Sequence, residues 1–193
     1  YFVGCVSSLF PRSYSVPQAF VQILERAGVD YALLGEEEWC CGYPLAVSGE
    51  LERARATARH NLEAVRATGA RVLVSACPSC YHFFQHAYPA LLGEEMDALP
   101  VHSTQYLAAL LQEGRLILRD DLPGQVVTYH DPCDLGRKGG EFEAPRRILQ
   151  HLPGVELREM AEHHELSHCC GGGGNLESVD AELGGAVARR RVQ

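Results

Sequence analysis

The sequence predicts an α/β fold made of two tandem Rossmann-like βαβ units, with parallel sheets, pseudo-twofold symmetry and cysteine loops at the strand ends. Strand-length apolar runs alternate with helix-length amphipathic runs, a pattern typical of parallel strand pairing. The eight cysteines fall into two groups related by a nearly constant shift. The length of 193 residues suits one large domain or two small ones.

The cysteine spacing indicates an internal duplication. Cys133 follows Cys5 by 128 residues, and the pair Cys169-Cys170 follows the pair Cys40-Cys41 by 129 residues. An Ile-Leu pair and then a Gly-Val pair precede each Cys-Cys-Gly motif. A repeated segment of this kind indicates two copies of one structural unit. The predicted units are residues 1–118 and residues 119–193.

The first unit is predicted to alternate strands with helices. Gly28 and Gly69 mark two helix ends, because glycine adopts the left-handed conformation that closes a helix. Apolar residues spaced by three and four predict that the second helix is amphipathic. Pro78 fits the first turn of a helix, where a missing N–H costs nothing. The predicted elements are strand 1–5, helix 17–26, strand 29–34, helix 49–67, strand 71–76 and a helix starting at Cys77-Pro78-Ser79-Cys80.

The second unit follows a connection through Pro100, a helix over 103–112 and a polar turn over 119–124. Its predicted elements are strand 125–129, helix 144–151, strand 155–160, the second cysteine loop and helix 176–191. By analogy with the first unit, a further strand and Cys-x-x-Cys are expected about 10 to 15 residues beyond Gln193. The second cysteine set is therefore predicted to be incomplete. The start at Tyr1, without Met or a signal peptide, is typical of an excised fragment.

Charge and hydropathy exclude several classes of function. A net charge of −8 argues against nucleic acid, whose phosphates require a basic face. The apolar runs fall far short of the roughly 20 residues that cross a bilayer, so no transmembrane segment is predicted. A chain of this size can bury a core without disulfides, so its cysteines favour cytosolic metal or redox chemistry.

Five cysteines of the first unit are predicted to meet at one edge of a parallel sheet. Thiolates are soft ligands that select zinc, copper(I) and iron–sulfur clusters, and five thiols exceed the four ligands of a zinc site. Adjacent residues of an extended chain face opposite sides, so Cys40 and Cys41 suit several irons better than one ion. The helix that starts at Cys77 offers N–H groups and a positive dipole end to a thiolate. These features favour an iron–sulfur site.

Three other interpretations of the cysteines remain open from the residues alone. A zinc-stabilised structural or interaction module without redox activity is the main alternative. A catalytic dithiol at Cys77 and Cys80 would also fit a helix start after a strand. The cysteines could also be buried apolar thiols, although random core residues would not repeat with this spacing.

The complete pattern resembles the cysteine-rich CCG domain. This domain occurs in heterodisulfide reductase subunits and in the iron–sulfur subunits of glycolate oxidase, anaerobic glycerol-3-phosphate dehydrogenase and lactate-utilisation proteins. The resemblance rests on Cys5, 34 intervening residues, Cys40-Cys41-Gly42, 34 more residues and Cys77-Pro78-Ser79-Cys80. A second copy is similar over Cys133, 35 intervening residues and Cys169-Cys170-Gly171. Residues 129–133 and 135–137 also match the family, whereas Asp134 stands where many members have His.

The resemblance implies an iron–sulfur electron-transfer domain of an oxidoreductase, with a non-cubane [4Fe–4S] cluster in each complete motif and zinc as the alternative metal. It implies flavin-containing or membrane electron-transfer subunits as partners. It also implies a cytoplasmic protein that such partners hold at the surface of the inner membrane. It names no substrate and no catalytic residue. The implied ligands of the first cluster are Cys5, Cys40, Cys41, Cys77 and Cys80. Those of the second are Cys133, Cys169 and Cys170.

Several polar and glycine-rich segments accompany the cysteines. The run Gly171–Gly174 lacks the glycine order of a nucleotide-binding loop and instead predicts close backbone approach to a cluster or substrate. His130 and Asp131 either orient a ligand or cap a strand. The histidines His163, His164 and His168 are predicted to be solvated rather than to bind metal. His82, Phe83, Phe84, His86 and Tyr88 are predicted to form a helix face against the core.

Overall fold

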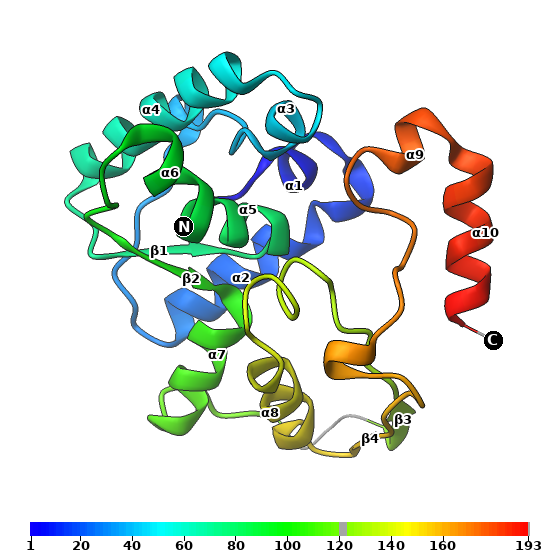
Figure 1. The fold of residues 1–193 in the computed structure, drawn as a ribbon. Coiled ribbons are helices and arrows are strands. Elements are labelled where there is room, and N and C mark those ends of the chain that lie inside the picture. Colours follow the sequence, from blue (N-terminus) through cyan, green and yellow to red (C-terminus); the bar gives the residue numbers. More distant parts are fainter. Residues whose placement is uncertain (120–122, 193) are drawn as a thin grey trace.

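Two parallel two-stranded sheets lie in the two halves of the chain (Figure 1). The computed structural model describes residues 1–119 and 123–192. Strand β1 (Val72–Ser75) pairs with β2 (Leu99–His102), and β3 (Gln125–Val127) pairs with β4 (Val155–Leu157). Helices make up most of the remaining ordered structure. The predicted mixed α/β class with parallel pairing is confirmed, whereas the pseudo-twofold relation between the two units stays a prediction.

The helices agree with most of the predicted ranges. The predicted helix 176–191 is interrupted at Asp180, whose side chain accepts a hydrogen bond from the Leu183 N–H and starts a new helix. The predicted polar turn over 119–124 falls mostly on residues 120–122, outside the described residues. The α-helices are α1 (Cys5–Leu9), α2 (Ser15–Arg26), α3 (Tyr43–Val47), α4 (Leu51–Thr68), α5 (Pro78–His82), α6 (Tyr88–Leu92), α7 (Ser103–Gln112), α8 (Glu143–His151), α9 (Leu176–Val179) and α10 (Ala181–Arg191). Short 3-10 turns are η1 (Pro11–Ser13), η2 (Gly35–Glu37) and η4 (His164–Leu166), and η3 (Phe83–Ala87) is a π-helical turn.

Two predicted strands, over 1–5 and 29–34, are not formed. Only Phe2 bridges to β1, through its N–H and the carbonyl of Val74 at 2.8 Å, and α1 already begins at Cys5. The segment 29–34 is joined to the start of the chain by one bond, from the Tyr1 ammonium to the Ala32 carbonyl at 2.7 Å. A strand is assigned only where a ladder of hydrogen bonds continues, and a single bond on each side does not make one.

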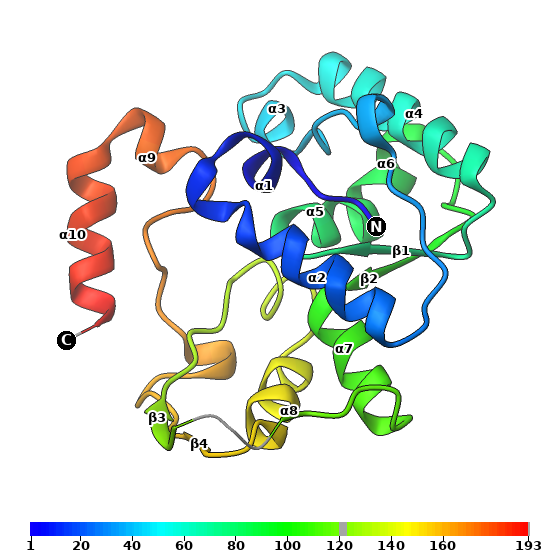
Figure 2. The same cartoon turned by 180° about the vertical axis from the view of Figure 1, so that it is seen from behind.

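The core of the first half lies on both faces of the β1–β2 sheet (Figure 2). Consecutive strand residues point to opposite faces, so Leu73 packs with Val65 of α4, whereas Val74 packs with Leu24 of α2. Burial of Phe83, Phe84 and Tyr88 confirms the predicted apolar face after Cys80, but His86 is exposed and His82 is only half-buried. The sheet and its helices therefore fix the end of β1, which Cys77 follows, and the end of the N-terminal segment, which Cys5 follows.

The second half has a polar centre instead. The guanidinium of Arg146, on α8, is buried together with the carboxylate of Asp131. Helix α8 packs on α7 and so connects the two halves, while α9 and α10 lie to one side (Figure 1). Across the part of the chain that the structure describes, no helix combines the length and the apolar character needed to cross a membrane.

Candidate metal centre

Cys5 is the first residue of α1, and a half-buried carboxylate holds the loop before it. Glu38 accepts hydrogen bonds from the N–H groups of Val3 and Gly4, at 2.9 and 2.7 Å. Gly4 has a φ of 84°, a left-handed conformation that glycine adopts readily, and a Cβ there would lie 3.6 Å from Sγ of Cys80. The backbone at Gly4 therefore passes directly beside the other end of the cysteine site.

Two buried polar side chains hold the Cys40-Cys41 loop. Asn61, fully buried on α4, accepts a hydrogen bond from the Trp39 N–H at 3.0 Å and donates one to the Cys40 carbonyl at 2.9 Å. The Tyr88 hydroxyl donates to the Cys41 carbonyl at 3.0 Å. These bonds satisfy backbone groups that no strand or helix partner reaches, so the loop has a defined shape without regular structure.

Cys77 and Cys80 begin α5 directly after β1. Cys77 is the N-cap of this helix, and its N–H donates to the Ser75 hydroxyl at 3.2 Å. On the other side, Nε2 of His102 lies 3.3 Å from the Ala76 carbonyl, so the end of β2 supports the same turn. The sequence correctly predicted that Cys77-Pro78-Ser79-Cys80 opens a helix after a buried strand.

The five thiols of the first motif lie together. Sγ of Cys5 is 3.8 Å from Sγ of Cys40, Cys41 contacts the thiols of both Cys40 and Cys80, and Cys77 contacts Cys80. Cys41 and Cys80 are buried, whereas the other three thiols are half-buried. Three chain segments that are far apart in sequence therefore place five soft donors in one continuous group.

Hydrogen bonding shifts the pKa values of these cysteines in opposite directions. Bonds from Cys41 and Cys5 lower the pKa of Cys40 to about 2, and a bond from Cys80 lowers the pKa of Cys77 to about 6, with help from the N–H groups that open α5. The hydrogen bond to Cys40, followed by burial, raises the pKa of Cys5. The hydrogen bond to Cys41, followed by the bond to Cys77 and by burial, raises the pKa of Cys80. Metal binding requires thiolates, and the lowered pKa values of Cys40 and Cys77 favour the thiolate at these two positions.

The donor set of the first motif consists of the soft sulfur atoms of five cysteines. Across residues 1–119 and 123–192, no group of three or more His, Cys, Asp or Glu side chains has an arrangement that would hold a metal ion. The five sulfurs instead form a chain of pairwise contacts from Cys5 through Cys41 to Cys77. Soft sulfur donors in such a chain are the ligand type of iron–sulfur clusters.

The second cysteine set is more open. Cys133 is half-buried, and burial raises its pKa, whereas Cys169 and Cys170 are exposed. The Cys169 sulfur accepts a hydrogen bond from the Gly171 N–H at 3.4 Å, and the Cys170 sulfur accepts one from the Gly172 N–H at 3.5 Å. Within the described part of the chain, no recorded hydrogen bond joins Cys133 to the other two sulfurs. The structure thus brings the first predicted set together more closely than the second.

A carboxylate joins the two sets. Asp134 accepts hydrogen bonds from the Ser79 hydroxyl and from the Lys138 ammonium, the latter at 2.6 Å, and one of its oxygens lies 3.9 Å from Sγ of Cys133. Burial alone would raise the pKa of Asp134, but these two donors lower it below its usual range. The Lys138 ammonium also lies 5.7 Å from the ring centre of Tyr43. Asp134 is therefore a contact between the two cysteine motifs.

Of the glycine run, Gly171 is buried against α10, whereas Gly172, Gly173 and Gly174 are exposed. A Cβ at Gly171, whose φ is 79°, would lie 2.3 Å from the Gly184 carbonyl on α10. Close backbone approach to a cluster or substrate was predicted for this run and stays a prediction, whereas the structure shows that Gly171 approaches the backbone of α10. Asn175 at the end of the run donates to the Pro44 carbonyl at 3.2 Å and to the Ser48 hydroxyl at 2.8 Å. The second cysteine loop is thereby attached to α3, which follows Cys41.

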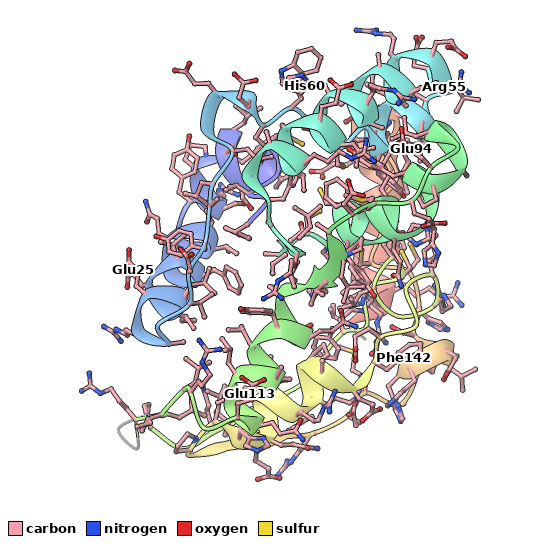
Figure 3. The ribbon with its side chains drawn as sticks, turned by 90° about the vertical axis from the view of Figure 1, so that its left-hand side faces the viewer. Glu25, Arg55, His60, Glu94, Glu113 and Phe142 are labelled. Atoms are coloured by element: carbon pink, nitrogen blue, oxygen red, sulfur yellow. The ribbon has the colours of Figure 1, made fainter. Side chains whose placement is uncertain are left out.

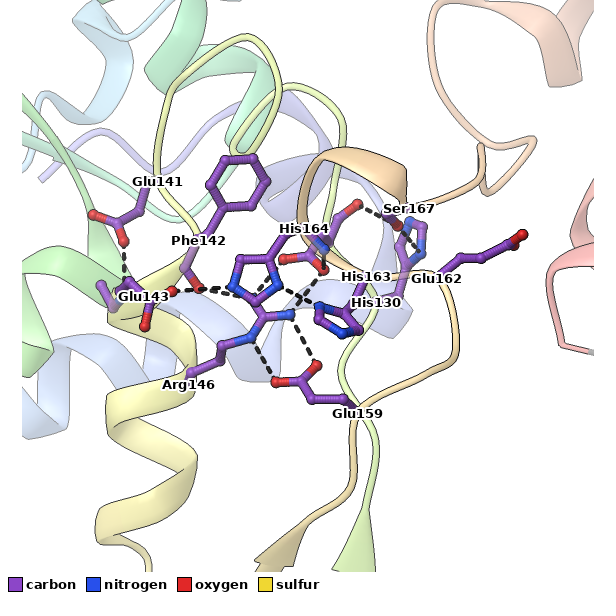
Figure 4. Close-up of polar contacts among 12 residues, drawn as sticks. His130, Glu141, Phe142, Glu143, Arg146, Glu159, Glu162, His163, His164 and Ser167 are labelled. Carbon is purple, nitrogen blue, oxygen red and sulfur yellow. Dashed lines mark hydrogen bonds and ion pairs between the residues drawn. The ribbon is translucent and has the colours of Figure 1, made fainter.

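Arg146 organises the polar residues that surround the start of the second unit (Figure 4). It donates to both oxygens of Asp131, at 2.6 and 2.9 Å, and to both oxygens of Glu159, at 2.7 and 2.9 Å. Burial would raise the pKa of Asp131, but the bonds from Arg146 and from the His164 N–H lower it. Asp131 thus has a structural role and anchors the segment that ends at Cys133.

The histidines near this ion pair contact protein groups. Nδ1 of His130 accepts a hydrogen bond from Nε of Arg191 at 3.0 Å, which ties the end of α10 to this segment. Nε2 of His164 lies 3.0 Å from Glu143, and Nδ1 of His168 lies 2.9 Å from Glu162. In the described residues, none of the recorded contacts joins these rings or His163 to a cysteine sulfur.

The sequence did not single out Glu38, Asn61 or Tyr88 as supports of the cysteine loops. One signal was available for Asn61, because it lies between Ala58 and Leu62 on the apolar stripe of a predicted amphipathic helix. A polar residue at a buried stripe position must find a partner, and here the partners are the backbone groups of the Cys40-Cys41 loop. Glu38 and Tyr88 carry no such signal, since their roles depend on the tertiary arrangement.

The sequence matches the profile of a protein family described as CCG, cysteine-rich domain, over residues 1–85 and 127–193. It is 38% identical over 196 residues to one subunit of the dihydromethanophenazine:CoB–CoM heterodisulfide reductase of Methanosarcina barkeri, covering 100% of this chain and 47% of the relative. It is 34% identical to the EtfAB:quinone oxidoreductase of Syntrophomonas wolfei, covering 100% and 26%. It is 32% identical to the probable iron-sulfur-binding oxidoreductase FadF of Bacillus subtilis, covering 100% and 27%. The chain thus spans about half the length of the first relative and about a quarter of the other two. No solved structure matches the chain.

Proposed function

Because the chain belongs to the CCG cysteine-rich domain family, we propose that it is an iron–sulfur electron-transfer domain of a CCG-type oxidoreductase. The observation that carries this proposal is the gathering of five thiols from three separate segments into one continuous group. Similarity to one part of a heterodisulfide reductase and to a probable iron-sulfur-binding oxidoreductase supports it. When bound, an iron–sulfur cluster takes up and releases electrons.

The chain's own residues would prepare and enclose this site. Glu38 and Asn61 hold the cysteine loops through backbone hydrogen bonds, so ligand positions are set before binding. Burial of Cys41 and Cys80 keeps water away from the inner side. We assign the first site, of the non-cubane [4Fe–4S] type, to Cys5, Cys40, Cys41, Cys77 and Cys80. We assign an incomplete second site to Cys133, Cys169 and Cys170.

Substrate choice is assigned to other parts of the protein or to its partners. The names of two relatives point to different substrates, a heterodisulfide in one and a quinone in the other. A shared domain with different substrates fits electron transfer as the common task. We therefore propose flavin-containing or membrane electron-transfer subunits as partners, which would hold a cytoplasmic chain at the inner membrane. We also propose that the chain consists of two units, residues 1–118 and residues 119–193.

Metal analysis tests the cofactor. Protein purified or reconstituted without oxygen should contain iron and acid-labile sulfide, roughly four irons per complete motif, and should absorb visible light. A colourless zinc protein is the competing outcome, and stoichiometric zinc without labile sulfide after reconstitution would refute the proposal. Oxygen must be excluded throughout, because exposed thiolates oxidise readily.

Single substitutions test the ligand set. Cys41→Ala and Cys80→Ala should each abolish or remodel the visible spectrum of the first site, because both sulfurs lie inside the thiol group. His163→Ala and His164→Ala are matched controls that should leave the spectrum intact, since their recorded contacts reach no cysteine. Equal iron content in the unaltered protein and both cysteine variants would rule out this assignment.

A further inference from the structure

Cys5 and Cys40 face one another from two separate segments of the first motif. Their sulfurs lie 3.8 Å apart, although 34 residues separate the two cysteines in the sequence. A disulfide joins two sulfurs at about 2 Å. The two sulfurs therefore need to approach by roughly 2 Å, and no distant segments have to be brought together first.

One carboxylate holds the two segments in this alignment. Glu38 lies two residues before Cys40 in the chain. Its carboxylate accepts hydrogen bonds from the N–H groups of Val3 and Gly4, at 2.9 and 2.7 Å, directly before Cys5. The segment that leads to Cys40 is thereby bound to the segment that leads to Cys5. Because these bonds join protein groups alone, they align the pair without a bound metal.

Helix α4 supports the Cys40 side of the pair. Figure 3 labels His60 on this helix, and its Nε2 donates a hydrogen bond to the Glu37 carbonyl at 2.8 Å. The His60 ring also stacks on the ring of Trp39, with 3.8 Å between the ring centres. Asn61, the next residue of α4, donates to the Cys40 carbonyl at 2.9 Å. The backbone up to Cys40 is therefore held, so closing the pair requires movement of side chains rather than of the loop.

Solvent access favours this pair over the other thiol contacts recorded in the described residues. Cys5 and Cys40 are both half-buried. Each other recorded contact between thiols of the first motif includes Cys41 or Cys80, which are only 2% and 3% exposed. Disulfide exchange proceeds by attack of a thiolate, and burial in apolar surroundings disfavours the thiolate. A dissolved oxidant should therefore link Cys5 and Cys40 before the other pairs.

We propose that Cys5 and Cys40 form a reversible disulfide in the metal-free protein, which closes the first metal site until a thiol reductant opens it. The bond removes two of the five sulfur donors that the structure brings together. Metal binding requires free thiolates, so the ligand set is incomplete while the bond is present. The consequence for cluster assembly rests on the proposed function, whereas formation of the disulfide does not.

The oxidant is a low-molecular-weight disulfide, RSSR. One thiolate of the pair attacks it, forms a mixed disulfide between the protein and SR, and releases the first RS⁻. The second protein thiol loses its proton to solvent, attacks the protein sulfur of the mixed disulfide and releases the second RS⁻. The protein pair thus loses two electrons and two protons, and RSSR is reduced to two molecules of RSH. An excess of thiol reductant reverses both steps.

The test treats the full chain, metal-free and reduced, with oxidised glutathione in the absence of oxygen. Two of the eight thiols should be lost, and mass spectrometry of the alkylated and digested protein should find Cys5 linked to Cys40. This product should exceed mixed glutathione disulfides by roughly tenfold, because the second thiol is held close to the first. Cys5→Ser should instead accumulate a glutathione adduct on Cys40. Cys77→Ser, the matched control, should leave the yield of the Cys5–Cys40 bond unchanged.

Metal binding measures the closing of the site. Cobalt(II) alone is the probe, because its thiolate complexes are coloured and because sulfide, which reduces disulfides, is left out. The closed protein should bind cobalt(II) at least roughly tenfold more weakly than the reduced protein, since two ligands are removed. Reduction of the closed protein, followed by desalting, should restore the binding.

Four results would overturn the proposal. They are a main disulfide between Cys77 and Cys80, glutathione adducts without a protein disulfide, an equal yield of the Cys5–Cys40 bond in protein unfolded in urea, or equal cobalt(II) binding by closed and reduced protein. The third would show that the fold does not align the pair. The proposed function is tested separately, because a protein that takes up zinc instead of an iron–sulfur cluster would still give every result expected here.

Discussion

The hydroxyl of Ser79 donates a hydrogen bond to the carboxylate of Asp134. Ser79 lies between Cys77 and Cys80, and Asp134 directly follows Cys133, so one bond joins the two cysteine motifs. The Asp134 side chain is nearly buried and also binds the Lys138 ammonium at 2.6 Å. The side chains of Ser79, Asp134 and Lys138 therefore hold the two motifs in position relative to one another.

Asp134→Ala should lower the free energy of unfolding by about 1–3 kcal/mol, because the half-buried Ser79 hydroxyl loses its acceptor. Asp134→Asn should cost less, since an amide oxygen still accepts that bond and the Lys138 ammonium is half-exposed. Urea unfolding of both variants measures the difference. Equal losses in the two variants would contradict the assignment of the main effect to the Ser79 bond.

Asn61→Ala should destabilise the Cys40-Cys41 loop by about 2–5 kcal/mol, because the Trp39 N–H and the Cys40 carbonyl both lose their partner in the interior. Iron retention after anaerobic reconstitution should fall with it. Tyr88→Phe is the milder comparison, since it removes only the bond to the Cys41 carbonyl and the contact with Asn61. Asn61→Ala with unchanged unfolding and unchanged iron would contradict this role.

His102 should make stability depend on pH in the acid range. Burial lowers the pKa of His102 to about 4. Its Nδ1 accepts from the Thr104 N–H at the start of α7, and a proton on Nδ1 would remove that cap. A lowered folded pKa gives stability that is present in full above the unfolded pKa, near 6.5, and is lost as the pH falls toward 4.

The expected loss over this window is at most roughly 3 kcal/mol, from a pKa difference of about 2.5 between 6.5 and 4. Thermal midpoints measured between pH 7 and pH 4 test it. His102→Asn is the matched control, because asparagine is also a good N-cap but does not titrate. A pH profile of this variant that is as steep as that of the unaltered protein would assign the dependence to other groups.

Arg146→Met should cost about 3–5 kcal/mol, because it leaves the carboxylates of Asp131 and Glu159 without their cation, and Asp131 is buried. The stability of Arg146→Lys should lie between that of Arg146→Met and that of the unaltered protein, since an ammonium cannot bind both carboxylates in the bidentate geometry of a guanidinium. Chemical unfolding at neutral pH gives the order. A methionine variant as stable as the unaltered protein would show that the ion pair gives no net stability.

The amphipathic helices were predictable because their signal is local. The predicted ranges 17–26, 49–67, 103–112 and 144–151 correspond to α2, α4, α7 and α8, with ends marked by glycine or by a change of periodicity. The unformed strands at 1–5 and 29–34 have suitable residues, but a strand needs a continued ladder of hydrogen bonds, and only single recorded bonds join these segments to their neighbours. Strand β2 (Leu99–His102) was not predicted, because Pro100 within it was interpreted as part of a connection.

The sequence predicted which cysteines of the first motif lie together, but not which side chains hold their loops. The predicted strand and helix ends indicated that the five cysteines of the first motif would meet. The structure places their sulfurs together, although the strands predicted before Cys5 and before Cys40 are not formed. The bonds from Asn61, Glu38 and Tyr88 to loop backbone depend on which helix passes behind each loop. No local pattern records that arrangement.

The charged centre of the second half has a thermal consequence. The heat capacity of unfolding arises mainly from exposed apolar surface, and exposed polar surface lowers it. A region organised around Arg146, Asp131 and Glu159 therefore contributes less heat capacity than the aromatic core around Phe84 and Tyr88. We expect its stability to change less steeply on cooling, so that calorimetry below room temperature would find the first half weakening earlier than the second.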